Sequence, residues 1–293
     1  MKLKTLINDN KIQFNRKFKR LLKTKLDNSI LSKAMYYSSN NGGKRIRPFL
    51  VNLASKIAKI NKYDAFILSA SIECIHSYSL VHDDLPCMDD DDYRRGKLST
   101  HKKFDEATAI LAGDALHDLA FELVSGNLRD KNNNSKIKLI NYLSMCIGHK
   151  GLALGQVLDL EFENKKIIKN KILDMYSRKT GKLFEFCFSA PFILKDENKN
   201  DIEFAKEFGM LFGLIFQIID DLIDEVGTFK KIGKTPGKDF KQGKSTLLRM
   251  MGEKNVIYLC EKKVDQFKKK NKERFDKYPL LSNLLDFGMN RVN

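Results

Sequence analysis

Residues that break helices are scarce along this chain. Its 293 residues include only 17 glycines and 5 prolines, so helices can be long and frequent, and a turn-rich β-sandwich is disfavoured. Apolar residues recur at helical spacing in segments separated by polar loops, and strand-like alternation is nowhere sustained. We therefore expect a single all-α domain over residues 1–293. The expected helices cover residues 12–26, 29–39, 64–85, 105–125, 135–161, 172–190, 201–226 and 244–270, with a further helix starting near Pro48 and Asp64 as the N-cap of 64–85.

The cysteines and the N-terminus indicate the compartment. The five cysteines are odd in number and scattered, without a CxxC pair, which argues against a disulfide framework or a zinc ribbon and is typical of a reducing cytoplasm. The basic start of the chain is soon followed by Asn8-Asp9-Asn10 rather than by the apolar core of a signal peptide. No apolar run approaches the ~20 residues of a membrane span. We expect a cytoplasmic protein without membrane insertion.

The chain is strongly basic, with a formal net charge of +16. Such a surplus is typical of proteins that bind nucleic acid, an anionic membrane or a phosphorylated substrate. It is equally typical of a general bias toward lysine, and here the lysines are dispersed along the chain. A nucleic-acid site needs a focused basic patch with interleaved aromatic residues. The charge therefore indicates function only where basic residues lie beside a group that needs them.

Two clusters of aspartate are the strongest functional feature. Six of the ten residues in Asp83–Asp92 are aspartate, directly after an apolar helical segment; alone, this run is equally well explained as a solvated loop. The second cluster lies on the expected helix 201–226, opposite its apolar face, and comprises Asp220, Asp221 and Asp224 with Gln217. Toward the N-terminus of this helix, the same face carries no charges but the small or apolar residues Gly209, Met210 and Gly213. This pattern favours the wall of a cleft over a solvated surface.

The spacing of these aspartates indicates magnesium. Carboxylates at i, i+1 and i, i+4 present oxygens along one helix edge, and Mg²⁺ is held by one or two carboxylates together with substrate phosphate and water. A calcium-binding EF-hand loop is absent, and acid–base catalysis needs two carboxylates rather than seven or more. Two clusters from different helices suit several divalent ions bridging a polyphosphate.

Basic residues near the aspartates suggest phosphate binding. Two glycines precede Lys44, Arg45 and Arg47 at an expected helix start, where phosphate is favoured. Arg94 and Arg95 follow the first cluster, although simple pairing with its aspartates is the alternative. Further candidates lie later in the chain, at Lys179, Thr180, Lys234 and Lys244.

Histidine and nucleophile motifs do not point to another chemistry. His76 lies seven residues before Asp83 on the same helix face and is a candidate phosphate or substrate contact, with a buried structural histidine as the alternative. The sequence has no HExxH zinc motif, no GxSxG elbow, and no cysteine with an evident histidine partner.

Together these motifs resemble the polyprenyl synthetase family of trans-isoprenyl diphosphate synthases over roughly residues 40–250. A single aspartate motif is a modest indication, but two in this order among the other segments are highly specific. The resemblance rests on Gly42–Pro48, Asp83–Gly96, Ala112–Leu116, Gly155-Gln156 with Asp159, Lys179–Gly181, Gln217–Asp224, Gly233-Lys234 and Gly243–Thr246.

The resemblance implies a bundle of long, mostly antiparallel helices around a central substrate cavity, usually in a homodimer. It implies three Mg²⁺ ions per active site, replaceable by Mn²⁺, on Asp83, Asp84, Asp89, Asp220, Asp221 and Asp224. It assigns isopentenyl diphosphate to Lys44, Arg47, His76 and Arg95. It assigns the allylic diphosphate to Arg94, Lys179, Thr180, Gln217, Lys234 and Lys244, of which Arg94 and Lys179 join the six aspartates as catalytic residues.

The implied reaction is the head-to-tail condensation of isopentenyl diphosphate with dimethylallyl and geranyl diphosphate through a Mg²⁺-assisted allylic carbocation. Tyr78, a bulky aromatic residue five positions before the first motif, implies a C15 product, (2E,6E)-farnesyl diphosphate. Ser79 lies one helical turn before Asp83 on nearly the same face. The C20 product geranylgeranyl diphosphate remains the alternative.

Other classes of protein make different predictions. A terpene cyclase would carry an Asn/Ser/Glu motif in place of the second aspartate cluster, and a non-catalytic subunit would have lost one cluster. A nucleic-acid-binding protein would be retained on heparin regardless of added diphosphate. Two features depart from the family pattern: Pro236 in the loop 233–239, and the end of the chain, where Arg291–Asn293 only loosely resembles the basic tails of some relatives.

Overall fold

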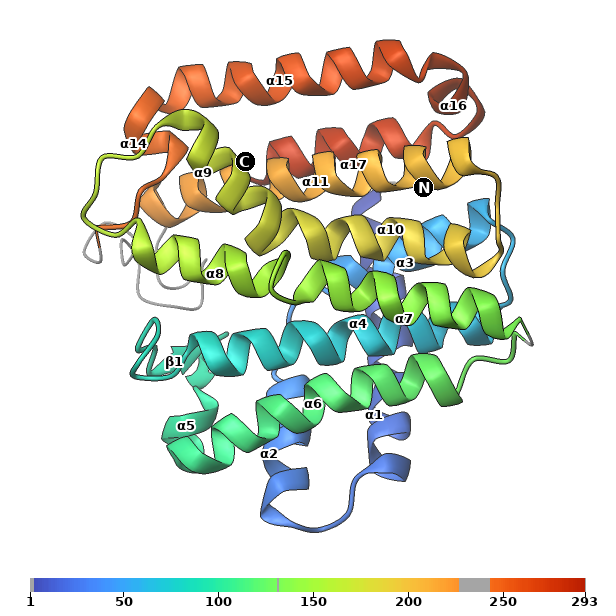
Figure 1. Cartoon of the computed structure of the whole chain (residues 1–293), viewed down its shortest axis with the longest axis vertical. Coiled ribbons are helices and arrows are strands. Elements are labelled where there is room, and N and C mark those ends of the chain that lie inside the picture. The colour runs from blue at the N-terminus through green and yellow to red at the C-terminus, as the bar shows by residue number, and fades with distance from the viewer. Residues whose placement is uncertain (1–2, 131, 227–242, 293) are drawn as a thin grey trace. The chain divides into compact units, whose positions relative to one another are not determined.

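The computed structural model describes residues 3–130, 132–226 and 243–292. It confirms the all-α prediction, since helices account for nearly all of its regular structure (Figure 1). The chain divides into two compact units. The N-terminal unit comprises Lys4–Tyr142 and Cys187–Ile202, and the C-terminal unit comprises Met1–Leu3, Leu143–Phe186 and Glu203–Asn293.

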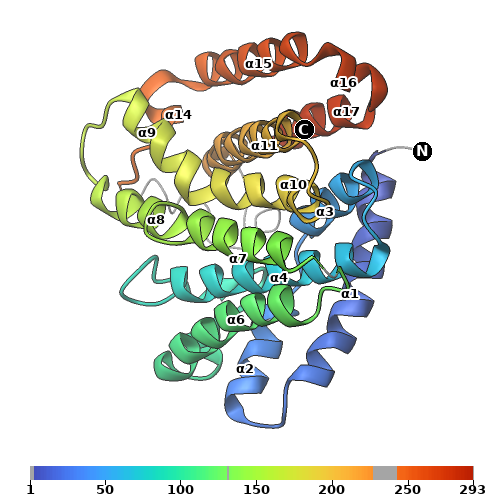
Figure 2. The same cartoon turned by 45° about the vertical axis from the view of Figure 1, so that its right-hand side comes forward.

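The N-terminal unit is built around helix α4, which packs along α6 and α3, while α2 packs against α6 (Figures 1 and 2). Its elements are α1 (Leu3–Lys25), α2 (Ile30–Ser39), α3 (Ile46–Ile57), α4 (Lys62–Asp83), β1 (Tyr93–Arg94), β2 (Lys97–Leu98), α5 (Thr100–Lys103), α6 (Glu106–Gly126) and most of α7 (Asn133–Ile147).

The C-terminal unit contains the other helices. They are α8 (Leu152–Glu161), α9 (Lys169–Tyr176), the π-helix η1 (Ser177–Gly181), α14 (Leu247–Met251), α15 (Glu253–Lys270), α16 (Lys272–Lys277), α17 (Leu280–Met289) and the 3₁₀ turn η2 (Asn290–Val292). Helices α10 (Lys182–Leu194) and α11 (Lys199–Val226) pass from one unit into the other. Here α8 packs against η1, and α15 packs against α14 and α17.

Helix α4 is buried over most of its surface, which explains its weakly amphipathic sequence. It begins two residues earlier than expected, because the Asn61 side chain caps it by accepting hydrogen bonds from the backbone N–H groups of Tyr63 and Asp64 (3.1 and 2.9 Å). The prediction that Asp64 is the N-cap is wrong. Its buried carboxylate accepts backbone hydrogen bonds from Arg129 and Asp130 (2.7 and 3.1 Å) and so anchors the loop after α6.

Glycines divide two of the expected helices. The expected helix 135–161 breaks into α7 and α8 around Gly148 and Gly151, where a side chain at Gly151 would overlap the Cys146 carbonyl. The expected helix 244–270 breaks at Gly252, because helical residues do not adopt its φ of 75°.

Among the described residues, no helix combines the length and apolar character needed to cross a bilayer. All five cysteines are free thiols, as expected from their scattered positions.

Candidate active site

The first aspartate cluster folds back on the end of α4. Backbone N–H groups of Asp89 and Asp91 donate to the carbonyls of Asp83 and Asp84 (2.8 and 3.1 Å), and that of Asp90 donates to Leu85 (3.0 Å). Beneath this loop Leu85 packs in a small apolar cluster with Val81, Ala109 and Met88. The loop is thus a closed turn on a rigid helix end rather than a freely solvated run.

A short hairpin that the sequence analysis did not predict follows the loop. Strands β1 and β2 pair antiparallel, with Tyr93 opposite Leu98 and Arg94 opposite Lys97. The two residues between them, Arg95 and Gly96, both have positive φ (55° and 76°), as a type I′ turn requires. Two residues are too few to give a periodic pattern, which is why this hairpin was missed. It fixes the backbone of both arginines that follow the aspartates.

Arg94 pairs with the aspartates before it. Its guanidinium donates to Asp84 Oδ1 (2.8 Å from Nε) and to Asp91 Oδ2 (3.0 Å). Burial raises the pKa of Asp84 to about 6, although the charge of Arg94 opposes the shift. Arg94 therefore pairs with the aspartates, which was the alternative to phosphate binding. The pairing places its positive charge directly on Asp84, a predicted metal ligand.

Arg95 belongs to a second group of cations in the same unit. It donates to the Gly42 carbonyl (2.9 Å) and lies 3.3 Å from His76 Nε2. Gly43 lies directly beside the guanidinium, and its φ of 100° is a conformation that favours glycine. Burial lowers the pKa of His76, and the charges of Arg47 and Arg95 lower it further, so the ring is neutral and accepts from Arg95.

Repulsion within this basic group also affects Arg95 itself. Burial lowers the pKa of Arg95 to about 10, Arg45 and Arg47 act in the same direction, and Glu73 opposes them. An anion bound between these side chains would relieve that repulsion. The structure thus brings together three of the four residues predicted to hold isopentenyl diphosphate; the fourth, Lys44, is exposed at the start of α3.

Arg45 has a structural role instead. Its buried guanidinium forms an ion pair with Glu73 and donates to Asn15 Oδ1 (2.9 Å) and to the Ser39 carbonyl (2.7 Å). The rings of Phe14 and Phe18 lie 5.7 and 5.9 Å from it. Lys44, Arg45 and Arg47 were all interpreted as candidate phosphate ligands, and for Arg45 this interpretation is wrong. The family resemblance assigned isopentenyl diphosphate to Lys44 and Arg47 but not to Arg45.

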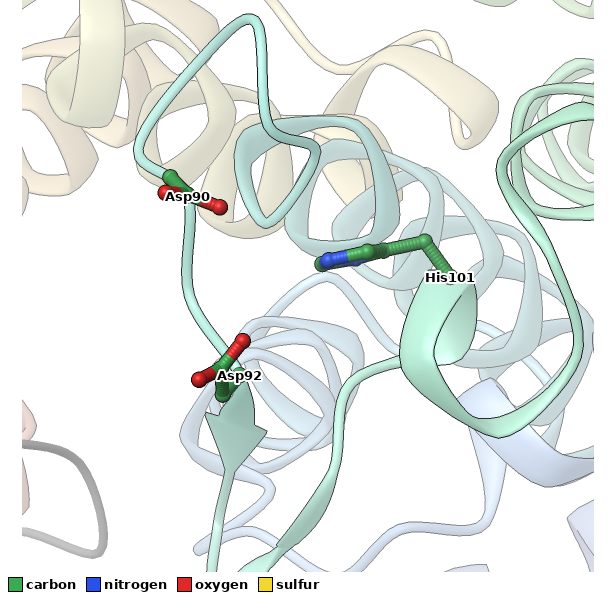
Figure 3. Close-up of side chains that lie close together, drawn as sticks. All are labelled: Asp90, Asp92 and His101. Atoms are coloured by element: carbon green, nitrogen blue, oxygen red, sulfur yellow. The ribbon is translucent and has the colours of Figure 1, made fainter.

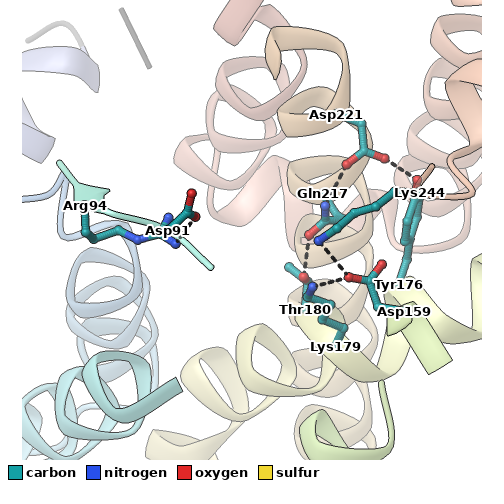
Figure 4. A network of polar contacts seen from close by, with 9 residues as sticks. All are labelled: Asp91, Arg94, Asp159, Tyr176, Lys179, Thr180, Gln217, Asp221 and Lys244. Atoms are coloured by element: carbon teal, nitrogen blue, oxygen red, sulfur yellow. Dashed lines mark hydrogen bonds and ion pairs between the residues drawn. The ribbon is translucent and has the colours of Figure 1, made fainter. Parts of the chain in front are cut away.

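A hydrogen-bonded network occupies the C-terminal unit (Figure 4). Lys179 and Lys244 both donate to Asp159 Oδ2, at 2.6 and 3.1 Å. Thr180 donates to Gln217 Oε1 (2.6 Å), and Gln217 Nε2 donates to Asp221 Oδ1 (2.7 Å). Five residues predicted to hold the allylic diphosphate or a metal therefore lie in two hydrogen-bonded groups, which meet at the neighbouring residues Lys179 and Thr180.

The π-helix η1 helps to build this network, because it contains Lys179 and Thr180. A side chain at Gly155 of α8 would overlap the Lys179 backbone, so the glycine allows α8 to approach η1 closely. Such π-turns are frequent at functional sites. The apolar spacing predicted an uninterrupted helix over 172–190, because nothing local in the sequence distinguishes a π-turn from an α-turn.

Asp159 is held ionised by its two lysines. Burial opposes ionisation, but Lys179 and Lys244 outweigh it and lower the pKa of Asp159 to about 2. Asp159 was part of the family pattern but was not predicted as a site residue. It keeps two cationic side chains extended and ordered.

The predicted metal ligands of α11 differ in their surroundings. Asp221 is buried and accepts a hydrogen bond from the Tyr176 hydroxyl, and that hydroxyl in turn accepts from the Leu247 N–H (3.2 Å). Burial and the charge of Asp221 raise the pKa of Tyr176 well above its usual range, so it remains a donor. Tyr176 was missed, since a lone tyrosine in a helix carries no motif.

The other two aspartates of α11 complete the second cluster. Asp224 is buried, whereas the half-exposed Asp220 forms an ion pair with Arg291, whose guanidinium lies 3.6 Å from the centre of the Phe216 ring. The basic end of the chain thus reaches the second cluster.

Two glycines that precede the second cluster on α11 allow the neighbouring helices to approach closely. A side chain at Gly209 would lie 2.5 Å from the Phe184 carbonyl oxygen, and one at Gly213 would lie 2.9 Å from Gly181 Cα and Phe184 Cβ. The prediction that these small residues line a cleft is wrong for the two glycines, which permit close packing of α11 against α10 and η1.

The two predicted chain-length residues lie on α4. The Tyr78 ring makes edge contacts with His82 and His117, at centroid distances of 5.5 and 5.2 Å. Burial, together with Asp83 and Asp114, raises the pKa of Tyr78 to about 12, so its hydroxyl is neutral. Ser79 is buried and its hydroxyl donates to the His76 carbonyl (3.1 Å).

The remaining predicted residues are placed as follows. Asp83 ends α4 and Asp89 follows in the loop, both half-buried. Lys234 lies outside the described residues. The predicted metal ligands supply carboxylate oxygens only, a donor set that suits a hard cation such as Mg²⁺.

Comparison with known proteins adds independent information. A family model described as polyprenyl synthetase matches residues 28–277. The farnesyl diphosphate synthase of Bacillus subtilis (strain 168) is 39% identical over 236 residues, which are 78% of this chain and 78% of that protein. That of Micrococcus luteus is 43% identical over 248 residues, covering 83% of this chain and 84% of that protein.

Solved structures are similar over almost the whole chain. An FPP/GFPP synthase from Zymomonas mobilis superposes with a TM-score of 0.84 at 32% identity, covering 99% of this chain and 100% of that one. A geranyltransferase from Helicobacter pylori, complexed with magnesium and isoprenyl diphosphate, gives a TM-score of 0.81 at 31% identity and covers 96% of each chain. The similarity therefore holds in both sequence and fold.

Proposed function

Because this chain belongs to the polyprenyl synthetase family, we propose that it condenses isopentenyl diphosphate with dimethylallyl and then geranyl diphosphate to give farnesyl diphosphate. Relatives named farnesyl diphosphate synthase support this assignment. The observation that carries it is that each aspartate cluster has its own set of buried or half-buried cations. Arg47, Arg94 and Arg95 accompany the first cluster, and Lys179 and Lys244 accompany the second.

We propose that Mg²⁺ is held by Asp83, Asp84 and Asp89 and by Asp220, Asp221 and Asp224, as three ions that Mn²⁺ can replace. The all-oxygen donor set and the magnesium complex of the Helicobacter pylori relative support this proposal. Bound there, the metal would neutralise the negative charge that develops on the departing diphosphate.

Lys179 and Lys244 would bind and orient the allylic diphosphate, with Lys234 as a further ligand. Their ammonium groups are held by one carboxylate in an already ordered arrangement, so little reorganisation is needed when the leaving group gains charge. Thr180 and Gln217 are hydrogen-bonded to each other, and Gln217 also donates to the buried Asp221.

Arg94 would act on the same leaving group from the first cluster. Its guanidinium donates to Asp84 and Asp91, so its charge lies beside the proposed metal ligands and would act on a diphosphate bound there. Lys44, Arg47, His76 and Arg95 would hold isopentenyl diphosphate. His76, as a neutral acceptor beside Arg95, positions the arginine rather than contributing charge.

Tyr78 and Ser79 would set the product length. A neutral aromatic ring held by edge contacts to two histidines is a rigid obstacle, which supports a C15 product over geranylgeranyl diphosphate.

We further propose that residues 1–293 act as one catalytic domain, that the enzyme is a cytoplasmic homodimer, and that it does not bind nucleic acid. Light scattering of the purified chain tests the dimer.

Substitution of one aspartate from each cluster tests the proposed site. Asp83→Asn and Asp220→Asn should each lower kcat at least a thousandfold, equivalent to about 4 kcal/mol of lost transition-state stabilisation, with helical content unchanged. Excess EDTA should abolish turnover of the wild type. Asp118→Asn, at an aspartate whose side chain is 86% exposed, should retain full activity. Near-normal rates in either cluster variant, or full turnover in EDTA, would refute the metal assignment.

A further inference from the structure

Two aspartates of the first cluster point away from Arg94 and toward a histidine. Asp91 is buried and pairs with Arg94, whereas its neighbours Asp90 and Asp92 are exposed. Figure 3 shows the carboxylates of Asp90 and Asp92 converging on the tip of the His101 ring, and one ligand atom from each of the three residues lies within 4.8 Å of the other two.

The histidine is buried and its outer nitrogen faces this cluster. His101 is 6% exposed, and its Nε2 atom has no hydrogen-bond partner among the described residues. A buried polar atom in that state is costly unless something binds it. Its other nitrogen, Nδ1, lies 3.2 Å from the hydroxyl of the buried Ser99. Nδ1–H can donate to this hydroxyl, which leaves the Nε2 lone pair directed at the two carboxylates.

The backbone holds the three residues in place. Asp90 has a positive φ of 50°, and its N–H donates to the Leu85 carbonyl (3.0 Å). The Ser99 N–H donates to the Asp92 carbonyl (2.9 Å), which ties the start of α5 to the aspartate loop. The carboxylate of Asp92 also meets Lys102 Nζ at 2.9 Å, but this pair is exposed, with side-chain exposures of 60% and 43%. Such exposed pairs contribute little stability and yield readily to a competing cation.

We propose that Asp90, Asp92 and His101 bind one divalent transition-metal ion, such as Zn²⁺, at a site separate from the Mg²⁺ sites. None of the three residues was among the predicted magnesium ligands. An imidazole nitrogen with two carboxylates suits zinc and similar ions, whereas Mg²⁺ prefers oxygen ligands only. With bonds of about 2.0–2.2 Å in a tetrahedral site, two ligand atoms lie roughly 3.3–3.6 Å apart. Because Asp90 and Asp92 are exposed, their side chains have room to rotate toward the ring and close the site.

The ion would stabilise the aspartate loop. Asp89–Asp92 are four consecutive acidic residues, and Arg94 donates hydrogen bonds to Asp84 and Asp91. A cation on the opposite side would offset the repulsion of Asp90 and Asp92. It would also link the loop to α5, and so would hold Asp89 and Arg94 in their positions.

Zinc titration of the full-length protein by calorimetry, in excess Mg²⁺ to occupy the magnesium sites, tests this proposal. The wild type should bind one Zn²⁺ per chain, and Asp92→Asn and His101→Asn should each weaken that binding at least tenfold. Because His101 is buried, its variant can fail to fold, in which case Asp90→Asn and Asp92→Asn, both at exposed positions, decide the outcome. Ser99→Ala should weaken zinc binding less than either ligand variant, since it removes only a hydrogen bond to the ligand.

Matched controls separate this site from other zinc-binding groups. Cys87→Ser and His149→Ala remove an exposed thiol and an exposed imidazole elsewhere, and both should leave zinc affinity within twofold of wild type. Co²⁺ provides a second readout, because its visible spectrum should change when His101 is replaced. The proposal is overturned if no zinc binds in excess Mg²⁺, or if the Asp90 and Asp92 variants bind it as tightly as the wild type.

Discussion

Replacing Asp159 by asparagine tests how two lysines are held in the C-terminal unit. The side chain of Asp159 is 8% exposed and accepts hydrogen bonds from Lys179 and Lys244. Asparagine has the same size, so the substitution removes the charge and leaves the packing nearly unchanged. Lys244, whose side chain is only 9% exposed, then loses the carboxylate that compensates its burial.

The shifted pKa gives the expected magnitude. The pKa of Asp159 falls from 3.8 to about 2 because the two lysines outweigh the cost of burial. Each pKa unit corresponds to about 1.4 kcal/mol, so ionised Asp159 contributes about 2.5 kcal/mol to the free energy of unfolding at neutral pH. Because the folded pKa is the lower one, this contribution is complete well above pH 3.8 and is lost as the pH falls toward 2. By the same linkage, about half of it remains at pH 3.

Urea unfolding followed by far-ultraviolet circular dichroism, in EDTA and without substrate, measures this contribution. Asp159→Asn should lower the unfolding free energy by at least ~2 kcal/mol at pH 7, and its difference from wild type should shrink by about 1 kcal/mol at pH 3. The control is Asp174→Asn at a half-exposed aspartate paired with Arg178, which should cost less than about 1 kcal/mol. An Asp159 variant as stable as wild type at pH 7, or a loss that does not change with pH, would refute this reasoning.

Three further substitutions test the N-terminal unit. Tyr78→Ala should shift the product toward C20 or longer, while Tyr78→Phe, which keeps the ring, should still give C15; an unchanged product in the alanine variant would mean that another residue limits the chain. Arg47→Ala should raise the KM for isopentenyl diphosphate at least tenfold, the loss of a charged contact worth about 1.5–3 kcal/mol, with little change in the KM for dimethylallyl diphosphate. Gly113→Ala should cost about 1–3 kcal/mol of stability, because the added methyl group would overlap the His82 ring. Gly126→Ala, in the same helix but with open space around it, should cost nothing, and equal losses in both would contradict the packing explanation.

The helices and aspartate clusters were predictable because both depend on local sequence. Apolar spacing correctly placed the helix that contains Asp221, and its apolar face is buried as expected, with Phe208, Phe212, Ile215 and Ile218 all in the core. The family motifs pointed to Lys179, Gln217 and Lys244, and the structure places these residues in two hydrogen-bonded groups that meet at η1.

Features that depend on distant partners were not predictable. Asp159 meets Lys179 and Lys244 across 20 and 85 residues of sequence, and Arg291 meets Asp220 across 71. Periodicity carries no information at such separations. Arg45 looked like its neighbour Arg47, and only the fold reveals that Glu73, Phe14 and Phe18 surround it.

Short or irregular local structure was also missed, for a different reason. The hairpin at Arg95 and the π-turn at Lys179 each span too few residues to produce a periodic pattern. The glycines of α11 were misread because a small residue allows either a cavity or a close helix contact. The choice between these two depends on the opposing helix.

Chain-length analysis of the product tests the central claim most directly. The purified chain is incubated with isopentenyl diphosphate, dimethylallyl diphosphate and Mg²⁺, and the products are dephosphorylated and separated by chain length. We predict that farnesol is the main alcohol recovered, with geraniol as the intermediate and nothing formed in EDTA. Recovery of no prenyl alcohol longer than the C5 substrates would contradict the assignment as a prenyltransferase, and a main product of C20 would contradict the proposed role of Tyr78.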